Sequence, residues 1–177
     1  MDDSNAQTEP ASNDILDRLT VVDPLALRNA MGSFLTGVTI VTTCNEAGEP
    51  YGLTVNSFNS VSLDPPLVLW SLDHSSDKID MFRKAAAFTV NVMGADESDM
   101  IWRFAKAETD RFDNTNWHWG ENQQPVLDDA LVSFECRLWA EYPGGDHAIF
   151  VGEVLNITQS DGKPAAFFKG KLGAYDG

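Results

Sequence analysis

The stretch 51–76, YGLTVNSFNSVSLDPPLVLWSLDHSS, constrains this chain more than any other part of the sequence. It predicts two apolar strands, at 51–55 and 67–72, and Pro65 and Pro66 exclude a helix ahead of the second one. So many hydrogen-bonding groups lie between and after these strands that we expect either a binding loop or a polar connector with capping serines. These groups are the uncharged side chains of Thr54, Asn56, Ser57, Asn59, Ser60, Ser62, Ser71, Ser75 and Ser76.

Short β-branched or alternating runs predict the remaining strands. They are expected at 38–44, 87–93, 130–141, 147–157 and 165–170. The polar turn at 45–50 predicts a hairpin between its flanking strands, and Gly152 indicates a bulge or a close backbone approach. About seven strands joined mostly by tight turns predict a mainly β fold, an antiparallel barrel rather than a βαβ sheet.

The chain is expected to form one domain, residues 23–177, behind a loosely attached polar tail of residues 1–22. Asp23 before Pro24 predicts the capped start of a short amphipathic helix that ends at Gly37. One side of that helix is apolar and carries Leu27, Ala30, Met31, Phe34 and Leu35.

Two further helices are expected between the strands. Ser75 and Ser76 predict the N-cap of one, and the acidic start and basic end of 96–106 predict the other. The segment 108–129 is long for a loop in a compact domain, so it is expected to cover a site or to pack on a partner subunit.

Composition and charge exclude several function classes. The net charge is -15, with a pI near 4.3, which argues against nucleic acid and anionic membranes because both attract basic patches. No apolar run approaches the ~20 residues of a membrane helix, and the acidic N-terminus is unlike a signal peptide, so we expect a cytoplasmic protein. Cys44 and Cys136 are expected to be free thiols, and the three scattered histidines predict no metal site.

The motifs that the chain lacks indicate that an organic cofactor carries its chemistry. It has no GxGxxG, no P-loop and no GxSxG, and no obvious nucleophile. The 54–62 loop offers donors for a flavin phosphate and for the ring edge that gains negative charge on reduction. Ser75 and Ser76, at an expected helix N-terminus, suit a phosphate, with Lys78, Arg83 and Lys84 close by in the sequence.

His147 is the second candidate site residue. It follows Pro143, Gly144, Gly145 and Asp146 at the entry to a strand. A histidine there suits a hydrogen bond to a nicotinamide carboxamide or the donation of a proton, and an exposed turn residue is the alternative.

Taken together, the motifs resemble the short-chain flavin reductases of two-component monooxygenases, which have an FMN-binding split barrel. The resemblance covers roughly residues 24–173. It depends on TGVTIVTT, GLTVNSFNSVSLDPPLVLWSLDHSS, FTVNV, RFAK, GGDHAIFVGEV and FFKG in that order. The second and fifth of these motifs are the specific ones. The implied fold is an antiparallel split β-barrel of Greek-key type.

The resemblance also implies roles for individual residues. The flavin, FMN or FAD, is expected to contact the loop and turn residues Thr54, Val55, Asn56, Ser57, Ser60, Ser71, Leu72, Ser75 and Ser76. The nicotinamide of NADH or NADPH is expected beside Asp146 and His147, with His147 as the catalytic residue. The family further implies a homodimer that supplies reduced flavin to a separate monooxygenase.

The sequence departs from the family at two places. Asn56 stands where a serine is common, and an amide can replace that hydroxyl as a donor. Leu172 stands where an aromatic residue is common near the end of the chain. Two alternative functions stay open. One is a flavin- or haem-binding protein without turnover, and the other is an oxidase of the pyridoxamine-phosphate type, although that site needs basic residues that this acidic chain poorly supplies.

Overall fold

The computed structural model describes residues 22–106 and 111–175. The expected tail, 1–22, therefore lies outside the described residues except for Val22. Within these ranges, no helix is long and apolar enough to cross a bilayer.

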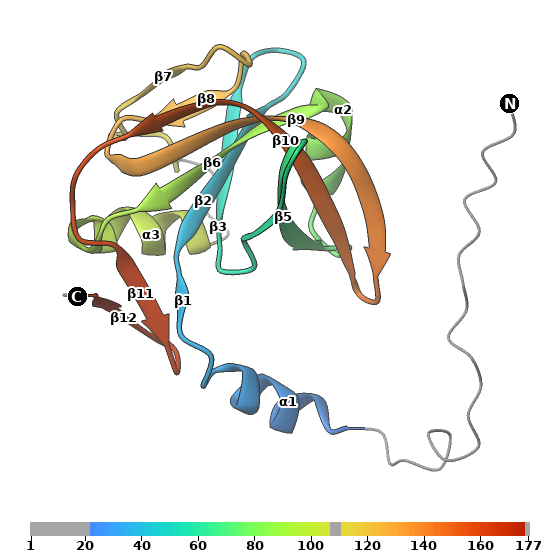
Figure 1. Cartoon of the computed structure of the whole chain (residues 1–177), viewed down its shortest axis with the longest axis vertical. Coiled ribbons are helices and arrows are strands. Elements are labelled where there is room, and N and C mark those ends of the chain that lie inside the picture. The colour runs from blue at the N-terminus through green and yellow to red at the C-terminus, as the bar shows by residue number, and fades with distance from the viewer. Residues whose placement is uncertain (1–21, 107–110, 176–177) are drawn as a thin grey trace, which may run out of the picture.

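Strands make up most of the described chain, so the predicted mainly β, antiparallel class is confirmed (Figure 1). The helices are α1 (Pro24–Met31), α2 (Ile79–Ala85) and α3 (Ser98–Ala105), with a 3₁₀ turn at Ala95–Glu97 before α3. The strands are β1 (Thr36–Gly37), β2 (Thr39–Cys44), β3 (Pro50–Val55), β4 (Asn59–Leu63), β5 (Pro66–Asp73), β6 (Ala87–Met93), β7 (Trp117–Trp119), β8 (Pro125–Leu127), β9 (Ala130–Gly144), β10 (His147–Gln159), β11 (Ala165–Phe168) and β12 (Lys171–Ala174).

The main sheet has seven strands in the order β3-β2-β6-β9-β10-β5-β4, all antiparallel. Its two edge strands, β3 and β4, follow each other in the sequence and are joined by residues 56–58. Flat, the edges would lie roughly 29 Å apart, at ~4.8 Å per strand. The link reaches at most ~14 Å, so the sheet must curl until its edges lie within that distance of each other.

Ser57 lies in the link between the two edge strands and is hydrogen-bonded to Ser71 of β5. We name this place, where the two edges of the sheet approach each other, the barrel seam. The hydroxyl of Ser57 accepts a hydrogen bond from the backbone N–H of Ser71 at 3.0 Å and lies 3.3 Å from the carbonyl oxygen of the same residue. This hydroxyl replaces a missing backbone partner on β5 beyond the point where β4 begins at Asn59. The polar loop of the sequence is thus, in part, the closure of the barrel.

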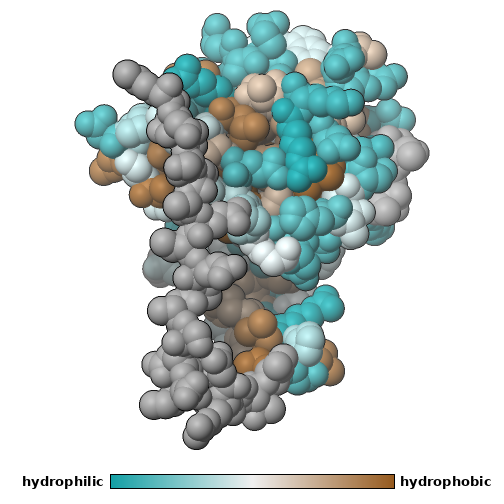
Figure 2. All heavy atoms as spheres, turned by 90° about the vertical axis from the view of Figure 1, so that its right-hand side faces the viewer, coloured by the Kyte–Doolittle hydropathy of each residue, from teal (hydrophilic) through white to brown (hydrophobic). Residues whose placement is uncertain are grey.

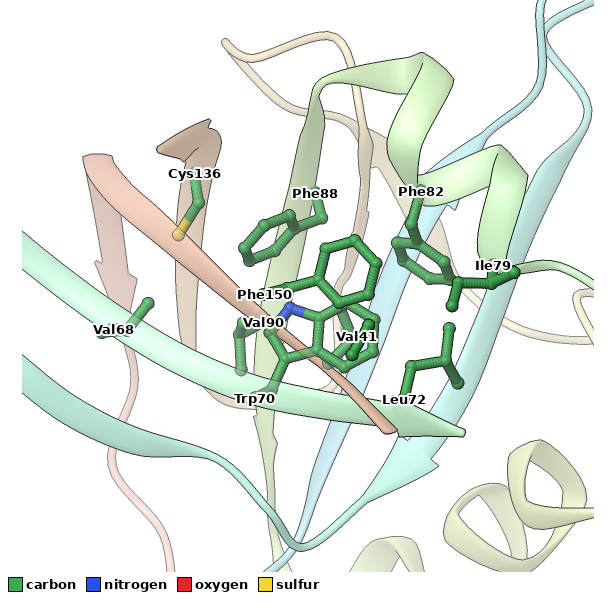
Figure 3. Packing of buried hydrophobic residues seen from close by; sticks show 11 residues of the cluster. Val41, Val68, Trp70, Leu72, Ile79, Phe82, Phe88, Val90, Cys136 and Phe150 are labelled. Atoms are coloured by element: carbon green, nitrogen blue, oxygen red, sulfur yellow. The ribbon is translucent and has the colours of Figure 1, made fainter. Parts of the chain in front are cut away.

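An aromatic cluster fills the barrel (Figure 3). Trp70 of β5 stacks on Phe150 of β10 with ring centroids 4.9 Å apart, and Phe82 of α2 meets Trp70 edge-on at 4.9 Å. Phe88 of β6 approaches Trp70 at 5.7 Å. Each of these four side chains is fully buried, and burying a large apolar side chain is worth ~1.5–3 kcal/mol. We name this set the aromatic core.

Most of the predicted strands are confirmed, and so is the 45–50 hairpin turn between β2 and β3. The register of β9 and β10 shifts between Val151 and Gly152, which confirms the bulge. The backbone approach is close as well, because a Cβ on Gly152 would lie 2.4 Å from Phe88. Cys136 is buried and Cys44 half-buried, and both are free thiols, as expected.

Five short strands were not predicted. The segment expected as a loop holds β4, whose sequence NSVSL is polar because it is an exposed edge strand. The long segment 108–129, described from residue 111, holds the hairpin β7–β8. That hairpin packs on the chain's own sheet, where the N–H of Leu127 donates to Asn91 at 3.0 Å. The strand β12 was missed too, and the two-residue strand β1 lies inside the expected helix.

The first helix has the predicted start, but its predicted end at Gly37 is wrong. The carboxylate of Asp23 caps α1 by accepting from the N–H of Ala26 at 2.8 Å. The helix stops at Met31, and the N–H of Gly32 donates to the carbonyl of Arg28. None of the eight residues of α1 is buried by the part of the chain that the structure describes.

The predicted start of the second helix is also wrong. It begins at Ile79 with Lys78 in the N-cap position, not at the two serines. The reason is local, because Asp73 holds the chain in turns before the helix. Its carboxylate accepts from the N–H of Ser75 at 2.7 Å, and its carbonyl accepts from the N–H of Ser76 at 3.0 Å.

Candidate functional site

A pocket of about 180 Å³ lies where β3 ends. Thr54, Val55 and Asn56, three of the predicted flavin residues, form one wall together with Val38. The hydroxyl of Thr54 donates to the carbonyl of Ile101 at 2.7 Å, which fixes the end of β3 against α3. The structure therefore brings these three residues together at a cavity, as a binding loop requires.

The other walls of the pocket were not predicted from the sequence. Ile101, Trp102 and Ala105 come from α3, and Phe167 and Leu172 come from β11 and β12. They are far from residues 54–56 in the sequence, so no local pattern joins them. Leu172, which departs from the family pattern, lines this pocket. An aliphatic side chain therefore lies where an aromatic one is common in the family.

The next group of predicted residues lies on the barrel seam. Ser57 and Ser71 are engaged with each other, as described, so the hydroxyl of Ser57 has a structural role. The side chain of Leu72 is buried in the hydrophobic cluster that surrounds the aromatic core (Figure 3), which leaves only its backbone for a ligand. Ser60 is exposed on the edge strand β4 opposite Val68 and does not line the pocket.

His147 and Asp146 lie at a corner between β5 and β10. The ring Nδ1 of His147 lies 2.7 Å from the carboxylate of Asp146, which leaves the ring Nε2 for other contacts. His147 pairs with Asp73 across the two strands, and the N–H of His74 donates to the carbonyl of Asp146 at 3.0 Å. Ser75 follows directly, so the predicted phosphate turn and the predicted nicotinamide residues meet at one corner.

The pocket and this corner lie along the same seam. Asn56 at the pocket is followed by Ser57, which is bonded to Ser71, and Asp73 at the corner lies two residues beyond Ser71 on β5. Two residues of strand span ~6.6 Å. The curl of the sheet thus brings together two parts of the sequence that are some 90 residues apart, about 54–57 and 146–147.

Carboxylates engage two of the cations near the corner. Arg83 forms a bidentate pair with Glu141, at 2.6 Å from Nη2, and reaches Asp80 at 3.2 Å. The hydrogen bonds from Arg83 lower the pKa of Glu141. Lys78 lies 3.1 Å from Asp77. Two of the three cations expected to assist a phosphate are therefore committed to carboxylates, which the sequence analysis did not predict.

The corner turn also has its own anion. The N–H and the hydroxyl of Ser75 both hydrogen-bond the carboxylate of Asp73 and lower its pKa. An external phosphate would have to share these donors with Asp73. The expected position of Ser75 and Ser76 at a helix N-terminus is therefore wrong, because the helix begins later, at Ile79. Their contact with a flavin phosphate stays a prediction.

The residues at the pocket fit the ring end of a flavin. The walls contributed by α3, β11 and β12 are apolar, and Thr54 and Asn56 bring polar groups to one side, which matches a ring system with one apolar and one polar end. Pockets that enclose whole ligands of this size range from ~300 Å³ upward, so this one has room for only part of a flavin. Among the described residues, no cluster of three histidine, cysteine or acidic side chains suits a metal ion.

Comparison with known proteins identifies the family. The family model for the flavin reductase like domain matches residues 31–176. The chain belongs to the flavin reductase-like family. Its split-barrel fold, expected from the resemblance, is confirmed with it.

Curated members of the flavin reductase-like family are closely similar to this chain. An FMN reductase (NADH) of Agrobacterium fabrum is 45% identical over 150 residues, which cover 85% of each chain. An NADH-dependent flavin reductase of a Rhodococcus species is 38% identical, with 85% of this chain and 86% of the relative covered. The match to the reductase component of a trigonelline monooxygenase of Acinetobacter baylyi, 40% identical, spans 81% of this chain but only 46% of that longer protein.

Solved structures of this family share the fold. An NADH:FAD oxidoreductase of Streptomyces globisporus, in complex with NAD and FAD fragments, superposes with a TM-score of 0.82 at 36% identity. The match covers 89% of this chain and 97% of that one. The flavin reductase PheA2 gives a TM-score of 0.81 at 33% identity, covering 88% of this chain and 100% of its own.

Proposed function

We propose that this protein is an NAD(P)H-dependent flavin reductase that transfers a hydride from the nicotinamide to FMN or FAD. The observation that carries the proposal is the shared seam, on which the pocket at Thr54–Asn56 and the corner at Asp146–His147 lie close together. The names of the Agrobacterium and Rhodococcus relatives support NADH as the donor.

Positioning is the main task of the residues in this proposal. A bound flavin supplies the two-electron acceptor. Thr54, Val55 and Asn56 hold its ring in the pocket, where backbone and amide groups favour the charge that the ring edge gains. Ser71, Ser75, Ser76 and the backbone of Leu72 lie along the way to the phosphate, with Ser57 holding the seam. Ser60, on the edge strand, is the predicted contact that the geometry supports least.

His147 orients the nicotinamide. Its Nδ1 is held by Asp146, so Nε2 faces the donor and can hydrogen-bond a carboxamide. Orientation of two reactants at contact distance lowers the barrier without acid–base chemistry. The described site accordingly needs no nucleophile and no metal.

The direct test is a steady-state assay that crosses NADH and NADPH with FMN and FAD. Purified protein is expected to oxidise at least one nicotinamide, and only when a free flavin is added or already bound. The absence of turnover in all four combinations would contradict the enzyme and leave a flavin-binding protein.

Replacement of His147 tests the arrangement of the site. The substitution His147→Ala is expected to raise KM for the nicotinamide about tenfold, since one lost hydrogen bond is worth ~1.4 kcal/mol, while the Kd for flavin stays within about twofold. The chain offers a matched control in His118, whose Nδ1 lies 2.6 Å from Asp128 away from the site. His118→Ala should change neither constant. A rise in the flavin Kd instead would move His147 to the flavin site.

We further propose that the protein is a homodimer. Large apolar side chains of α1 and the residues after it stay exposed, including Leu25, Met31 and Phe34 at 59–66%. Figure 2 shows apolar residues at the lower end of the molecule, where α1 lies in Figure 1. A second copy of the chain is the occupant that the family resemblance implies.

The reduced flavin is proposed to serve a separate monooxygenase. Several relatives are named as reductase components or subunits of such systems, among them a 4-nitrophenol monooxygenase of Rhodococcus opacus. The cytoplasm is the proposed compartment, which agrees with two free cysteines. The protein should support product formation by a flavin-dependent monooxygenase that is supplied without its own reductase, and failure to do so despite NADH oxidation would remove this partner class.

A further inference from the structure

Trp102 stands apart from the other apolar residues of α3. The large side chains of Met100, Ile101 and Phe104 are buried at 0–5% exposure, which fixes the inner face of this helix. Trp102 is 45% exposed on the same, fully described helix. An exposed surface position on a helix is usually polar, so a large aromatic ring there needs a separate explanation.

The position of Trp102 supplies that explanation, because this residue lines the pocket. It shares the pocket with Thr54, Val55 and Asn56, the residues that are expected to hold the flavin ring. The indole is thus the largest flat apolar surface that borders the cavity and is still open to solvent.

The backbone that carries Trp102 is well fixed. Its neighbour Ile101 accepts the hydrogen bond from Thr54 at 2.7 Å, and Phe104 is fully buried against β3 at Gly52. Arg103 donates to the carbonyl of Asp113 at 3.3 Å. The helix cannot shift away from the end of β3 without breaking these contacts, so the ring stays beside the flavin loop.

We propose that Trp102 stacks on the flavin ring and is a binding and positioning residue for it. The inference rests on the proposed function and adds a contact that comes from α3, outside every predicted flavin segment. The physical basis is general, since flat aromatic ligands gain from an offset-stacked indole, and stacking between a base and an aromatic side chain has a similar basis. The cavity is too small for the whole flavin, so one half-exposed ring at its border suits a ligand that is only partly enclosed.

Fluorescence and direct binding test this assignment without turnover. The holoprotein is stripped of any bound flavin and titrated with FMN, and the quenching of tryptophan emission is followed in the wild type, Trp102→Phe and Trp102→Ala. The matched control is Trp119→Ala, since Trp119 is 46% exposed but packs edge-on against Trp117 at 5.0 Å, outside the pocket. Ultrafiltration gives the Kd for FMN independently of the fluorescence.

Trp102→Ala is expected to raise the Kd for FMN about tenfold or more, as loss of a stacked ring does. Trp102→Phe, which keeps a ring, should lose the share of the quenching that comes from Trp102 but bind FMN more tightly than Trp102→Ala. Trp119→Ala should bind FMN like the wild type. Circular dichroism and thermal unfolding show that each variant is folded, which is expected because both indoles are exposed.

Two results would overturn the inference while the proposed function stands. In one, the wild type binds FMN and all three variants bind it equally well. In the other, Trp102→Ala raises only KM for NADH, which would make the indole a nicotinamide contact. If the wild type neither binds FMN nor oxidises NADH, the proposed function fails and this inference fails with it.

Discussion

The aromatic core and helix α1 are both rich in large apolar residues, yet they have opposite surroundings. Trp70, Phe82, Phe88 and Phe150 are fully buried within one chain. Leu25, Leu27 and Met31 of α1 are 52–64% exposed. The barrel therefore obtains its stability from its own side chains, whereas the apolar residues of α1 contribute little to the fold of one chain. Exposed apolar residues gathered on one helix are typical of an interaction surface.

The largest expected effect comes from truncation inside the core. Phe150→Ala removes a ring that stacks on Trp70, and such a change in a packed core costs ~3–5 kcal/mol of unfolding free energy. Phe34→Ala, at a residue that is 66% exposed, is the matched control and should cost at most ~0.5 kcal/mol at low protein concentration. Urea unfolding of both variants gives these values. Equal losses of unfolding free energy in the two variants would contradict the difference in burial between the aromatic core and the region of α1.

A smaller effect on folding, and a larger one on assembly, is expected from charges on α1. Leu27→Glu with Met31→Glu places two carboxylates one turn apart on the exposed helix. Unfolding free energy at low protein concentration should change by less than ~0.5 kcal/mol, because these side chains are not buried in one chain. Light scattering at micromolar concentration should give a dimer for the wild type and a monomer for the double variant. A wild-type monomer would contradict the proposed homodimer.

The two cysteines provide a finer test of the inside of the barrel. Burial raises the pKa of the Cys136 thiol to about 12, and burial also raises the pKa of the half-buried Cys44 thiol. At pH 9 a thiol reagent should label Cys44 slowly in the native protein and Cys136 only after unfolding. Rapid labelling of both thiols would show that the core opens.

Stability should follow the same pKa shift. The folded protein keeps the Cys136 thiol protonated to a higher pH than the unfolded chain does, because its folded pKa is raised. The contribution of this thiol to the free energy of unfolding is therefore fully present below about pH 9 and is lost as the pH rises toward about 12. The difference in unfolding free energy between the wild type and Cys136→Ala should therefore narrow over this range. If the difference in unfolding free energy between the two proteins stays constant over this range, the pKa of Cys136 is not raised.

Local patterns in the sequence predicted the central strands because these strands are short runs rich in β-branched and apolar residues, most of which are buried. β2 and β6 are examples. The edge strand β4 escaped prediction because an exposed edge has the polar composition of a loop. The start of α2 was misplaced since Asp73, outside the expected helix, takes the hydrogen bond from Ser75.

The candidate site was predictable only in part, for a related reason. Thr54–Asn56 and His147 were found through motifs, each continuous in sequence. Trp102, Phe167 and Leu172 reach the pocket from α3, β11 and β12, which are far from residues 54–56 in the sequence, so only the tertiary fold brings them to it. The engagement of Arg83 by Glu141 likewise joins residues 58 positions apart, which no local pattern reports.

Anaerobic flavin reduction tests the central claim most directly. FMN and NADH are mixed without oxygen, a sub-stoichiometric amount of the protein is added, and the visible absorbance of the oxidised flavin is followed, with NADPH and FAD in parallel. The account predicts complete bleaching at a rate proportional to the protein concentration, with slower bleaching for His147→Ala at low NADH. Bleaching no faster than in a protein-free control, for every pair of flavin and nicotinamide, would contradict it.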